Sequence, residues 1–472
     1  MNPATVPWVS CGLLSLLTGA IISKNLDSGK PTRTAASAAA LLCTLCLAFA
    51  AAACVSSPAH SFVDPLVPWL KADVLNAVTM AVFAAVTAIT IMMSPQRETG
   101  GNQISGLLLV SLATLTATAA SHPALFVLGW CGTGIPFLAG MFGPLEYPRT
   151  FITGFFLSGI SVAAASLTMH PDSSGAVPEL STSGVVLLLA AVMFRKGLFP
   201  FFPLASKPFE ESNLAATNLL FNGHLGAVLV CKASLSGLNA PGAQAVRLIG
   251  DAALITALLA SVRAFADRNP RRVVGFVCLS QASFILAGIA TATPEGGAGA
   301  LLHWTVVALA STALLNILRS VEARVTDARN PLSHLGLAAK TPRLAACFVI
   351  SGLALVGLPG TLDFCAEDLL FHGALEAHPL LGLLLPLATA LNAIHVIRVF
   401  QTLFLGTLPK HVHDVPDALP RERWPLAFIT AFLIIGGLIP ALILPLHLPA
   451  AEHLAKGLTA HLPLRPSQPT TP

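Results

Sequence analysis

The stretch that decides the fold reads Val192-Met-Phe-Arg195-Lys196-Gly-Leu-Phe-Pro200-Phe-Phe-Pro203. Two adjacent cations stand inside an apolar run, and a glycine and two prolines follow them. Charged side chains are costly in lipid, so such residues usually face the interior of a helix bundle or a water-filled cavity. The glycine and prolines loosen the helix beside them. The stretch therefore predicts a broken helix with buried charge. The alternative is that the cations snorkel at a helix end that Pro200 marks.

The composition of the whole chain indicates that lipid is the solvent for much of it. Of the 472 residues, 54% are apolar and only 10% are charged, whereas a typical soluble domain has about 25% charged residues. Mean hydropathy is +0.77. The apolar segments exceed the roughly 18 residues of a spanning helix, and they lack the alternation of barrel strands. The sequence predicts an all-α polytopic membrane protein.

Fourteen spans are predicted, with boundaries good to about four residues. They begin near Val6, Ala35, Leu75, Ile104, Pro123, Thr150, Gly184, Leu214, Ala245, Arg272, Gly299, Arg343, Pro379 and Trp424. We expect residues 1–448 to form a single transmembrane domain and residues 449–472 to form a polar, Pro-rich, loosely ordered tail. No Lys or Arg precedes the first apolar run, so we expect a retained helix there rather than a cleaved signal peptide.

The connections between the predicted spans alternate in charge. Most basic residues stand in the odd-numbered connections, whereas the even-numbered ones carry little beyond Lys71, Lys232 and Arg247. The positive-inside rule then places the odd connections in the cytoplasm and both termini on the outer, periplasmic side of a bacterial inner membrane. The net charge of +4 is thereby interpreted as a topology signal rather than a nucleic-acid patch.

A second interrupted segment follows the predicted start of span twelve. It reads Gly357-Leu-Pro-Gly360, and Asp363, Glu367 and Asp368 come directly after it. Broken helices with nearby carboxylates line polar cavities in ion transporters. The alternative is an ordinary loop between two helices. The two breaks lie five spans apart, in corresponding positions of two possible repeats at about residues 104–236 and 245–405, which favours an ion or proton path.

Four further polar residues stand inside predicted spans. They are His224 on the eighth, His303 on the eleventh, and His395 and Arg398 on the thirteenth. A histidine titrates near neutral pH and suits a proton relay. A lone buried histidine is as often only hydrogen-bonded, so the role of each stays open. We expect Arg398, near a helix end, to snorkel or to pair with an acid.

No sequence pattern for a catalytic, metal or cofactor site stands out. Among the nine cysteines, Cys43 and Cys46 form a C-x-x-C inside a helix rich in Ala and Leu, with no second pair. Buried small residues are the better interpretation. The sequence has no iron–sulfur framework, no G-x-G-x-x-G fingerprint and no nucleophile–base pair. We expect no cofactor and no catalytic site on this chain, so any electron transfer would occur on another chain.

With these residues in view, the chain resembles the antiporter-like subunits of respiratory complex I and the Mrp cation/proton antiporters, over roughly spans three to thirteen. The stretch from Arg195 to Pro200 is similar to the family's Lys-x-x-x-x-Pro on a broken seventh helix. Residues 269–281, ending in Ser-Gln281, look like a family segment of basic residues followed by Ser-Gln. His303 falls on a histidine that opens the eleventh helix.

The later motifs continue the resemblance. Gly357-Leu-Pro followed by Glu367 matches the broken twelfth helix, whose charged residue is Lys or Glu, and Arg398 matches an arginine on helix thirteen. The family's fold implies fourteen helices, two inverted five-helix repeats with helices 7 and 12 broken, and outward termini. Its mechanism implies Lys196 as the proton carrier and Arg195 as a fixed counter-charge. The candidate proton path is Lys196, Arg195, His224, His303 and Glu367, supported by Asp363, Asp368, Arg398 and Gln281.

Four positions depart from the family pattern. Cys131 follows Trp130 where pumping members carry a Glu, and Arg195 stands at the family lysine. Arginine does not release its proton in a protein. Asn218 aligns with the helix-eight histidine, and Ser311 takes the place of a lysine eight residues after His303.

Three functions remain open from the sequence. The leading hypothesis is a proton- or cation/proton-translocating subunit of a complex I-like (NADH-quinone oxidoreductase-like) or antiporter-like assembly. Its partners would be other membrane subunits, the lipid bilayer and protons or monovalent cations, with no nucleic acid. The alternatives are a non-pumping structural scaffold subunit and a membrane partner of an inorganic-carbon uptake system.

Overall fold

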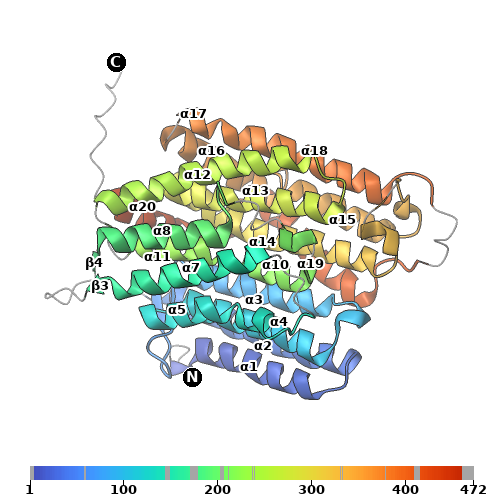
Figure 1. Ribbon diagram of the computed structural model, residues 1–472, viewed down its shortest axis with the longest axis horizontal. Coiled ribbons are helices and arrows are strands. Elements are labelled where there is room, and N and C mark those ends of the chain that lie inside the picture. The colour runs from blue at the N-terminus through green and yellow to red at the C-terminus, as the bar shows by residue number, and fades with distance from the viewer. Residues whose placement is uncertain are drawn as a thin grey trace.

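A computed structural model gives the fold as a bundle of roughly parallel and antiparallel helices (Figure 1). It describes residues 5–57, 60–143, 149–170, 179–201, 207–210, 212–235, 238, 240–329, 331, 333–377, 379–408 and 415–459. Most of these residues are helical, and the others form turns, connecting segments and two short antiparallel hairpins. The all-α polytopic class predicted from composition is confirmed.

The elements of the first half begin at one edge of the bundle. In chain order they are α1 (Trp8–Asn25), α2 (Lys30–Ser56), β1 (Ser61–Val63), β2 (Lys71–Asp73), α3 (Ala77–Met92), η2 (Gln96–Glu98), α4 (Gly101–Ala119), α5 (Pro123–Gly132), α6 (Ile135–Leu138), α7 (Arg149–Leu167), β3 (Met169–His170), β4 (Glu179–Leu180), α8 (Thr182–Lys196), α10 (Leu214–Asn222) and α11 (Leu225–Leu235).

The second half completes the bundle. Its elements are α12 (Ala240–Ala264), α13 (Pro270–Ala290), α14 (Pro294–Glu322), η3 (Thr326–Arg329), η4 (Leu337–Ala339), α15 (Pro342–Ala354), α16 (Leu362–Ala377), α17 (Pro379–Gly382), α18 (Leu384–Phe404), α19 (Pro420–Leu438), η5 (Pro440–Leu442), η6 (Leu444–Leu446) and α20 (Leu448–Thr459).

The lengths and hydropathy of these helices identify candidate membrane spans. Within the described residues, seven helices are long and apolar enough to cross a membrane, or eight if the bent pair of α19 with Pro440–Leu446 is one span. Further apolar helices are shorter, among them α3 and α15. The count of fourteen spans, the two inverted repeats and the outward termini therefore stay predictions.

Helices α13 and α14 form the centre of the bundle. Figure 1 shows α1 and α2 at one edge and α16 and α18 at the other, with α13 and α14 between them. The most apolar window of each central helix is entirely buried, as expected for helices that are apolar all round. Helix α14 packs against α3, α10, α13, α15, α16, α19 and α20. A polar side chain on α14 is therefore held away from lipid.

The helix breaks expected from glycine and proline are present in the backbone. Helix α8 ends at Lys196, and Gly197 takes a left-handed conformation (φ 62°). Helices α15 and α16 flank the break at Gly357 and Gly360, which have φ of 65° and 90°. A third irregularity was not predicted: His224 lies between α10 and α11 with φ 41°, a conformation that non-glycine residues seldom adopt.

The loosely ordered tail expected for residues 449–472 is wrong for its first part, because Leu448–Thr459 form helix α20, and residues 460–472 lie outside the described residues. Its small and apolar residues share one buried face that includes Ala450, Leu454 and Leu458. That spacing of four residues keeps them on one side of a helix, which packs on α11 and α14. The polar residues between them, and Pro449 at the second position of the helix, obscured this pattern in the sequence.

Candidate functional site

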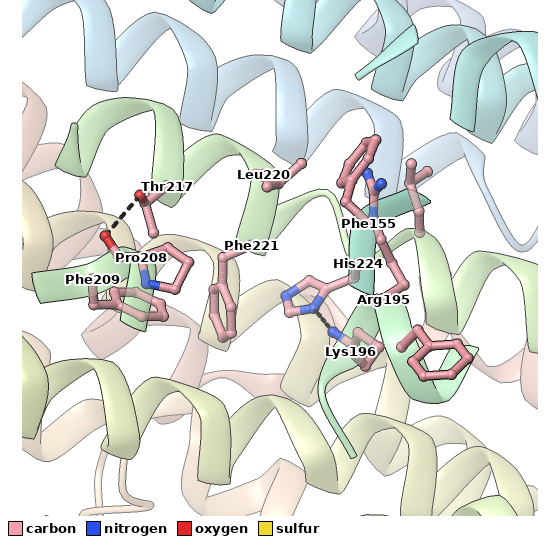
Figure 2. A pocket seen from close by; sticks show the side chains of 11 residues that line it. Phe155, Arg195, Lys196, Pro208, Phe209, Thr217, Leu220, Phe221 and His224 are labelled. Atoms are coloured by element: carbon pink, nitrogen blue, oxygen red, sulfur yellow. Dashed lines mark hydrogen bonds between the residues drawn. The ribbon is translucent and has the colours of Figure 1, made fainter. Parts of the chain in front are cut away.

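The end of α8 places Lys196 inside the bundle, against the irregular turn between α10 and α11. Its Nζ lies 2.7 Å from Nδ1 of His224, and Figure 2 shows the two side chains meeting. Gly226 makes room for this contact, because a Cβ there would approach Cγ of Lys196 to 2.6 Å. The amine of Lys196 and the imidazole of His224 are both buried, so Lys196 does not snorkel to the membrane surface.

This contact can hold only one proton between the two nitrogens. When Lys196 is an ammonium group, it donates to an unprotonated Nδ1 of His224; when Lys196 is neutral, Nδ1–H can donate to it. Nε2 of His224 has no hydrogen-bond partner among the described residues. A proton can therefore pass between Nζ and Nδ1 without a change of geometry, and Nε2 offers a second point of exchange.

Arg195 turns away from His224 and is held by aromatic rings. Its Nη2 donates to Oγ1 of Thr133 at 2.6 Å. The guanidinium lies 4.5 Å from the ring centre of Phe155 and 5.1 Å from that of Trp130. Such cation–π contacts stabilise a desolvated cation. The two adjacent cations thus have different surroundings, and only Lys196 has a partner that exchanges protons.

A small cavity joins these groups. It has a volume of about 60 Å³ and is lined by both cations, by His224 and by aromatic side chains that include Phe221. Figure 2 shows Phe221 beside the His224 ring within this cavity, and the ring centres lie 5.5 Å apart. A cavity of this size has room for a few water molecules. The residues around it can therefore exchange protons with water as well as directly.

A second polar cluster lies on the central helix at His303. Its Nδ1 lies 2.6 Å from Oδ1 of Asp363, and its Nε2 lies 2.9 Å from the backbone carbonyl of Gln281. All these groups are fully buried. A carbonyl only accepts, so Nε2 must carry a proton and donate. The proton of the other contact then belongs to Nδ1 or to the carboxyl, giving an ion pair or a neutral pair.

Glu367 completes the second cluster beside the broken twelfth span. One nitrogen or oxygen atom from each of His303, Asp363 and Glu367 lies within 4.8 Å of the others. Oε1 of Glu367 accepts from Oγ1 of Thr389 at 3.0 Å. A Cβ at Gly357 would lie 2.5 Å from Oε2 of Glu367, so a side chain there would force the carboxylate to move. The break and the acid therefore form one site.

The two clusters approach each other through α14. The His224 ring meets the edge of Trp304 with 5.5 Å between ring centres, and Trp304 is the residue after His303. The structure thus brings Lys196, His224, His303 and Glu367 into one buried region of the bundle. No described hydrogen bond joins His224 directly to His303.

The structure separates three predicted residues from this region or changes their role. Asp368 is 61% exposed and lies beside His372, so it is no part of the buried cluster. Arg398 donates to backbone carbonyls of Ala264, Phe265 and Asp267 at the far end of α12. Gln281 reaches His303 through its backbone carbonyl.

An uncharged network was missed by the sequence analysis. Asn222 donates to Oδ1 of Asn218 at 2.8 Å, and Asn218 donates to Oγ1 of Thr90 at 2.9 Å. Ser311 donates to Asn222 at 3.0 Å, and Thr312 joins both asparagines. A pattern that predicts this network is present in the sequence, because Asn218 and Asn222 are four residues apart and share one helix face. The two departures at Asn218 and Ser311 are thus part of the same hydrogen-bonded network.

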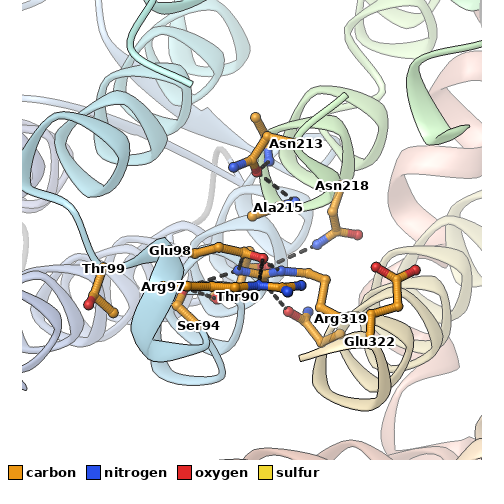
Figure 3. A network of polar contacts seen from close by, with 12 residues as sticks. Thr90, Ser94, Arg97, Glu98, Thr99, Asn213, Ala215, Asn218, Arg319 and Glu322 are labelled. Carbon is orange, nitrogen blue, oxygen red and sulfur yellow. Dashed lines mark hydrogen bonds and ion pairs between the residues drawn. The ribbon is translucent and has the colours of Figure 1, made fainter. Parts of the chain in front are cut away.

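Buried ion pairs lie at one end of the same helices. Arg319 of α14 donates to Oε2 of Glu98 at 2.7 Å and to Oγ of Ser94 (Figure 3). It also donates to Oδ1 of Asn316. Arg271 is paired with Glu322 in the same way. Burial by itself would raise the pKa of the Glu98 carboxyl, but the neighbouring Arg319, helped by Arg97, lowers it below its ordinary value of 4.5.

Comparison with known proteins gives a match that covers both clusters. The transmembrane family described as NADH:quinone oxidoreductase/Mrp antiporter matches residues 151–392, a little over half of the chain. NADH-quinone oxidoreductase subunit M of Mycobacterium tuberculosis is 25% identical over 335 residues, which are 70% of this chain and 59% of that protein. Subunit N of Cereibacter sphaeroides is 27% identical over 357 residues, 72% and 77% of the two chains. The chain thus spans about three fifths of the first curated relatives.

Solved structures share the fold over nearly the whole chain. A chain of respiratory complex I from Thermus thermophilus superposes with a TM-score of 0.81 at 23% identity, covering 95% of this chain and 99% of that one. A chain of the Mrp complex from Dietzia has a TM-score of 0.75 at 18% identity, covering 95% and 52%. Both of those structures are multi-subunit membrane complexes by their descriptions.

Proposed function

Because the chain belongs to the NADH:quinone oxidoreductase/Mrp antiporter transmembrane family, we propose that it is a proton- or cation/proton-translocating subunit of a larger membrane complex. The observation that carries this proposal is the pairing of Lys196 with His224 at 2.7 Å, deep in the bundle. A buried amine that shares its proton with an imidazole is a carrier rather than a structural ion pair.

The first step of the proposed path is proton exchange between Lys196 and His224. The shared contact lets the proton leave Nζ for Nδ1, while Nε2 of His224 releases its own proton towards α14. The neighbouring guanidinium of Arg195, held by Thr133 and two aromatic rings, stays charged. Its fixed charge disfavours a second positive charge on Lys196 and so favours release.

The second step uses the acid cluster on the other side of α14. A proton that reaches His303 raises the net charge of the His303–Asp363 pair from zero to plus one. Glu367 lies close enough for its own proton affinity to change in consequence. Because the three groups lie within 4.8 Å, moving one charge changes the proton affinity of its neighbours. Alternate charging of Lys196 and Glu367 would then move protons between two half-channels. Water molecules would carry the proton wherever two neighbouring groups of the path make no direct hydrogen bond.

Proton flux in reconstituted vesicles tests this proposal. We expect Lys196→Ala and Glu367→Gln each to lower flux about tenfold or more, since a positioned proton-transfer group contributes roughly 10²–10⁴-fold in enzymes. The complete complex, isolated with its own partners, is the sample.

The matched controls change charges of the same type outside the buried region. Lys24→Ala removes an exposed lysine at the end of α1, and Asp368→Asn removes an exposed acid one residue from Glu367. Both controls should keep wild-type flux. Unchanged flux in both test variants would rule out the relay.

A second candidate function is a structural scaffold subunit that pumps nothing. It is favoured by Arg195, which makes fixed contacts at the position of the family lysine, and by Cys131, which replaces the family's acid. Under this alternative, Arg195→Ala releases a partner subunit from the purified complex while proton flux is kept. Loss of flux with all subunits retained would contradict the scaffold.

A further inference from the structure

The structure contains a larger cavity that the proton path does not use. It has a volume of about 360 Å³ and lies where α4 ends, α5 begins and α11 ends, against the sides of α7 and α8. That volume falls near the lower end of the roughly 300–1,000 Å³ of ligand pockets. Two cations, Lys71 and Lys232, stand at this cavity with Asp73 and His122.

The polar end of the cavity is electropositive. Nζ of Lys232 donates to the backbone carbonyl of Ala120 at 2.7 Å, which holds the ammonium group at the cavity. Asp73 is engaged by its own turn, since Oδ1 accepts from the backbone N–H groups of Leu75 and Asn76. Nδ1 of His122 accepts a hydrogen bond from the backbone N–H of Ala124 at the start of α5. The charged groups therefore sum to one excess positive charge.

The start of α5 adds to this positive end. Pro123 and Phe126 of its first turns line the cavity, and the positive end of a helix dipole favours anions. The two lysines are the primary ligands of any anion, and the helix end supports them.

The remaining wall of the cavity is apolar, and two of the helices that form it carry exposed apolar side chains. Phe126, Val162 and Leu188 line it. On the same two helices, α5 and α7, Leu128 is 66% exposed and Leu167 is 83% exposed. Apolar side chains exposed beside a cavity are where acyl chains would lie in a membrane. The cavity thus has a cationic end, and Leu128 and Leu167 directly follow the lining residues Val127 and Ser166 in the sequence.

We propose that this cavity binds the phosphate head group of an anionic phospholipid, with Lys71 and Lys232 at the phosphate and the acyl chain along α5 and α7. Both lysines stand in even-numbered connections, so the site lies at the end of the bundle predicted to face outward. The proposal is independent of the proton path, because none of the path residues lines this cavity.

Native mass spectrometry of the purified complex tests the proposal, with phosphatidylglycerol and phosphatidylcholine as probes. We expect the wild type to retain phosphatidylglycerol in preference to phosphatidylcholine. The double variant Lys71→Gln, Lys232→Gln should bind phosphatidylglycerol at least about tenfold more weakly, because each basic residue near a surface attracts anionic lipid. The control Lys456→Gln removes a lysine that is 77% exposed on α20 and should change nothing.

A second variant distinguishes loss of lipid binding from loss of folding in the double variant. Ala165 is 2% exposed and lines the cavity, so Ala165→Phe fills it while both lysines remain. We expect this variant also to lose phosphatidylglycerol. Equal retention by wild type and both variants would overturn the proposal. Displacement of the lipid by excess inorganic phosphate would overturn the lipid assignment, because it would show a site for a free anion.

Discussion

At the scale of single residues, the proposed chemistry depends on two short contacts whose proton has two possible positions. The pair of Lys196 with His224 and the pair of His303 with Asp363 are each short enough for a proton to pass without movement of a heavy atom. The sequence analysis chose Lys196 and His303 correctly as buried groups, yet it treated Asp363 only as support. The structure makes Asp363 the direct partner of His303.

That partnership predicts a strong effect of Asp363→Asn. An amide cannot take up or release the shared proton, so we expect proton flux in vesicles to fall about tenfold or more, as for the neighbouring Glu367→Gln. Asp368→Asn, five residues further on and exposed, is the control for general effects on α16. Wild-type flux in Asp363→Asn would show that His303 works without an acid partner.

The break before α16 makes a separate prediction for Gly357. Gly357→Ala would place a Cβ 2.5 Å from Oε2 of Glu367, at a residue with φ 65°. Gly360→Ala is a matched control, because its φ is 90° but its Cβ would meet nothing within 4 Å. Both variants should lose roughly 1–2 kcal/mol of stability from the left-handed backbone, as measured by thermal unfolding. Only Gly357→Ala should also lose proton flux. Equal flux in the two variants would contradict the role of Gly357 at the acid.

At the scale of elements, buried ion pairs connect helices that are far apart in the chain. Arg319 is 1% exposed and pairs with Glu98 in the connection after α3. We predict that Arg319→Ala destabilises the protein by about 1.5–3 kcal/mol, because it removes the charged hydrogen bonds to Glu98 and leaves this carboxylate with only the more distant Arg97. Arg97→Ala is the control: its side chain is 52% exposed and 3.8 Å from the same carboxylate, so less than about 1 kcal/mol should be lost. Denaturation of the solubilised protein measures both.

The same ion pair predicts how stability depends on pH. The pKa of Glu98 is lowered in the folded protein from its ordinary value of 4.5, so the folded state binds fewer protons at this group than the unfolded state. Its contribution is present above pH 4.5 and is lost as the pH falls through the lowered pKa. The melting temperature of the wild type should therefore fall on acidification below about pH 4.5, and Glu98→Gln should lack that part of the fall. An identical acid response in both proteins would contradict the linkage.

The elements also show how far sequence reasoning reaches. The breaks at Gly197 and Gly357 were predicted, because glycine and proline act locally on the helix that contains them. The turn at His224 was not, because its conformation is set by the packing of α10 and α11 and has no glycine or proline at that residue. The partners of Arg319 and Asn218 were missed for a related reason: both depend on which helices meet in space, which periodicity along one chain does not specify.

At the scale of the whole molecule, the unequal distribution of basic residues predicts its orientation in the membrane. We expect a membrane-impermeant maleimide to label Glu452→Cys, an exposed position of α20, on intact cells. Lys24→Cys, at the exposed end of α1, should be labelled only after the cells are permeabilised, because the first connection is predicted to be cytoplasmic. The unsubstituted protein measures labelling of the native cysteines. The reverse pattern would invert the predicted topology.

The pair of Arg319 with Glu98 has a consequence for biosynthesis. The two residues are 221 positions apart in the chain, and a ribosome adds roughly 5–20 residues per second. For roughly 10 to 45 s after Glu98 is made, its partner does not yet exist. Until α14 is synthesised, the early helices therefore lack this contact, and Glu98 has only the exposed Arg97 as an ionic partner. The last step that fixes the N-terminal helices therefore belongs to the second half of translation, and a chain truncated before α14 should leave them open to proteases.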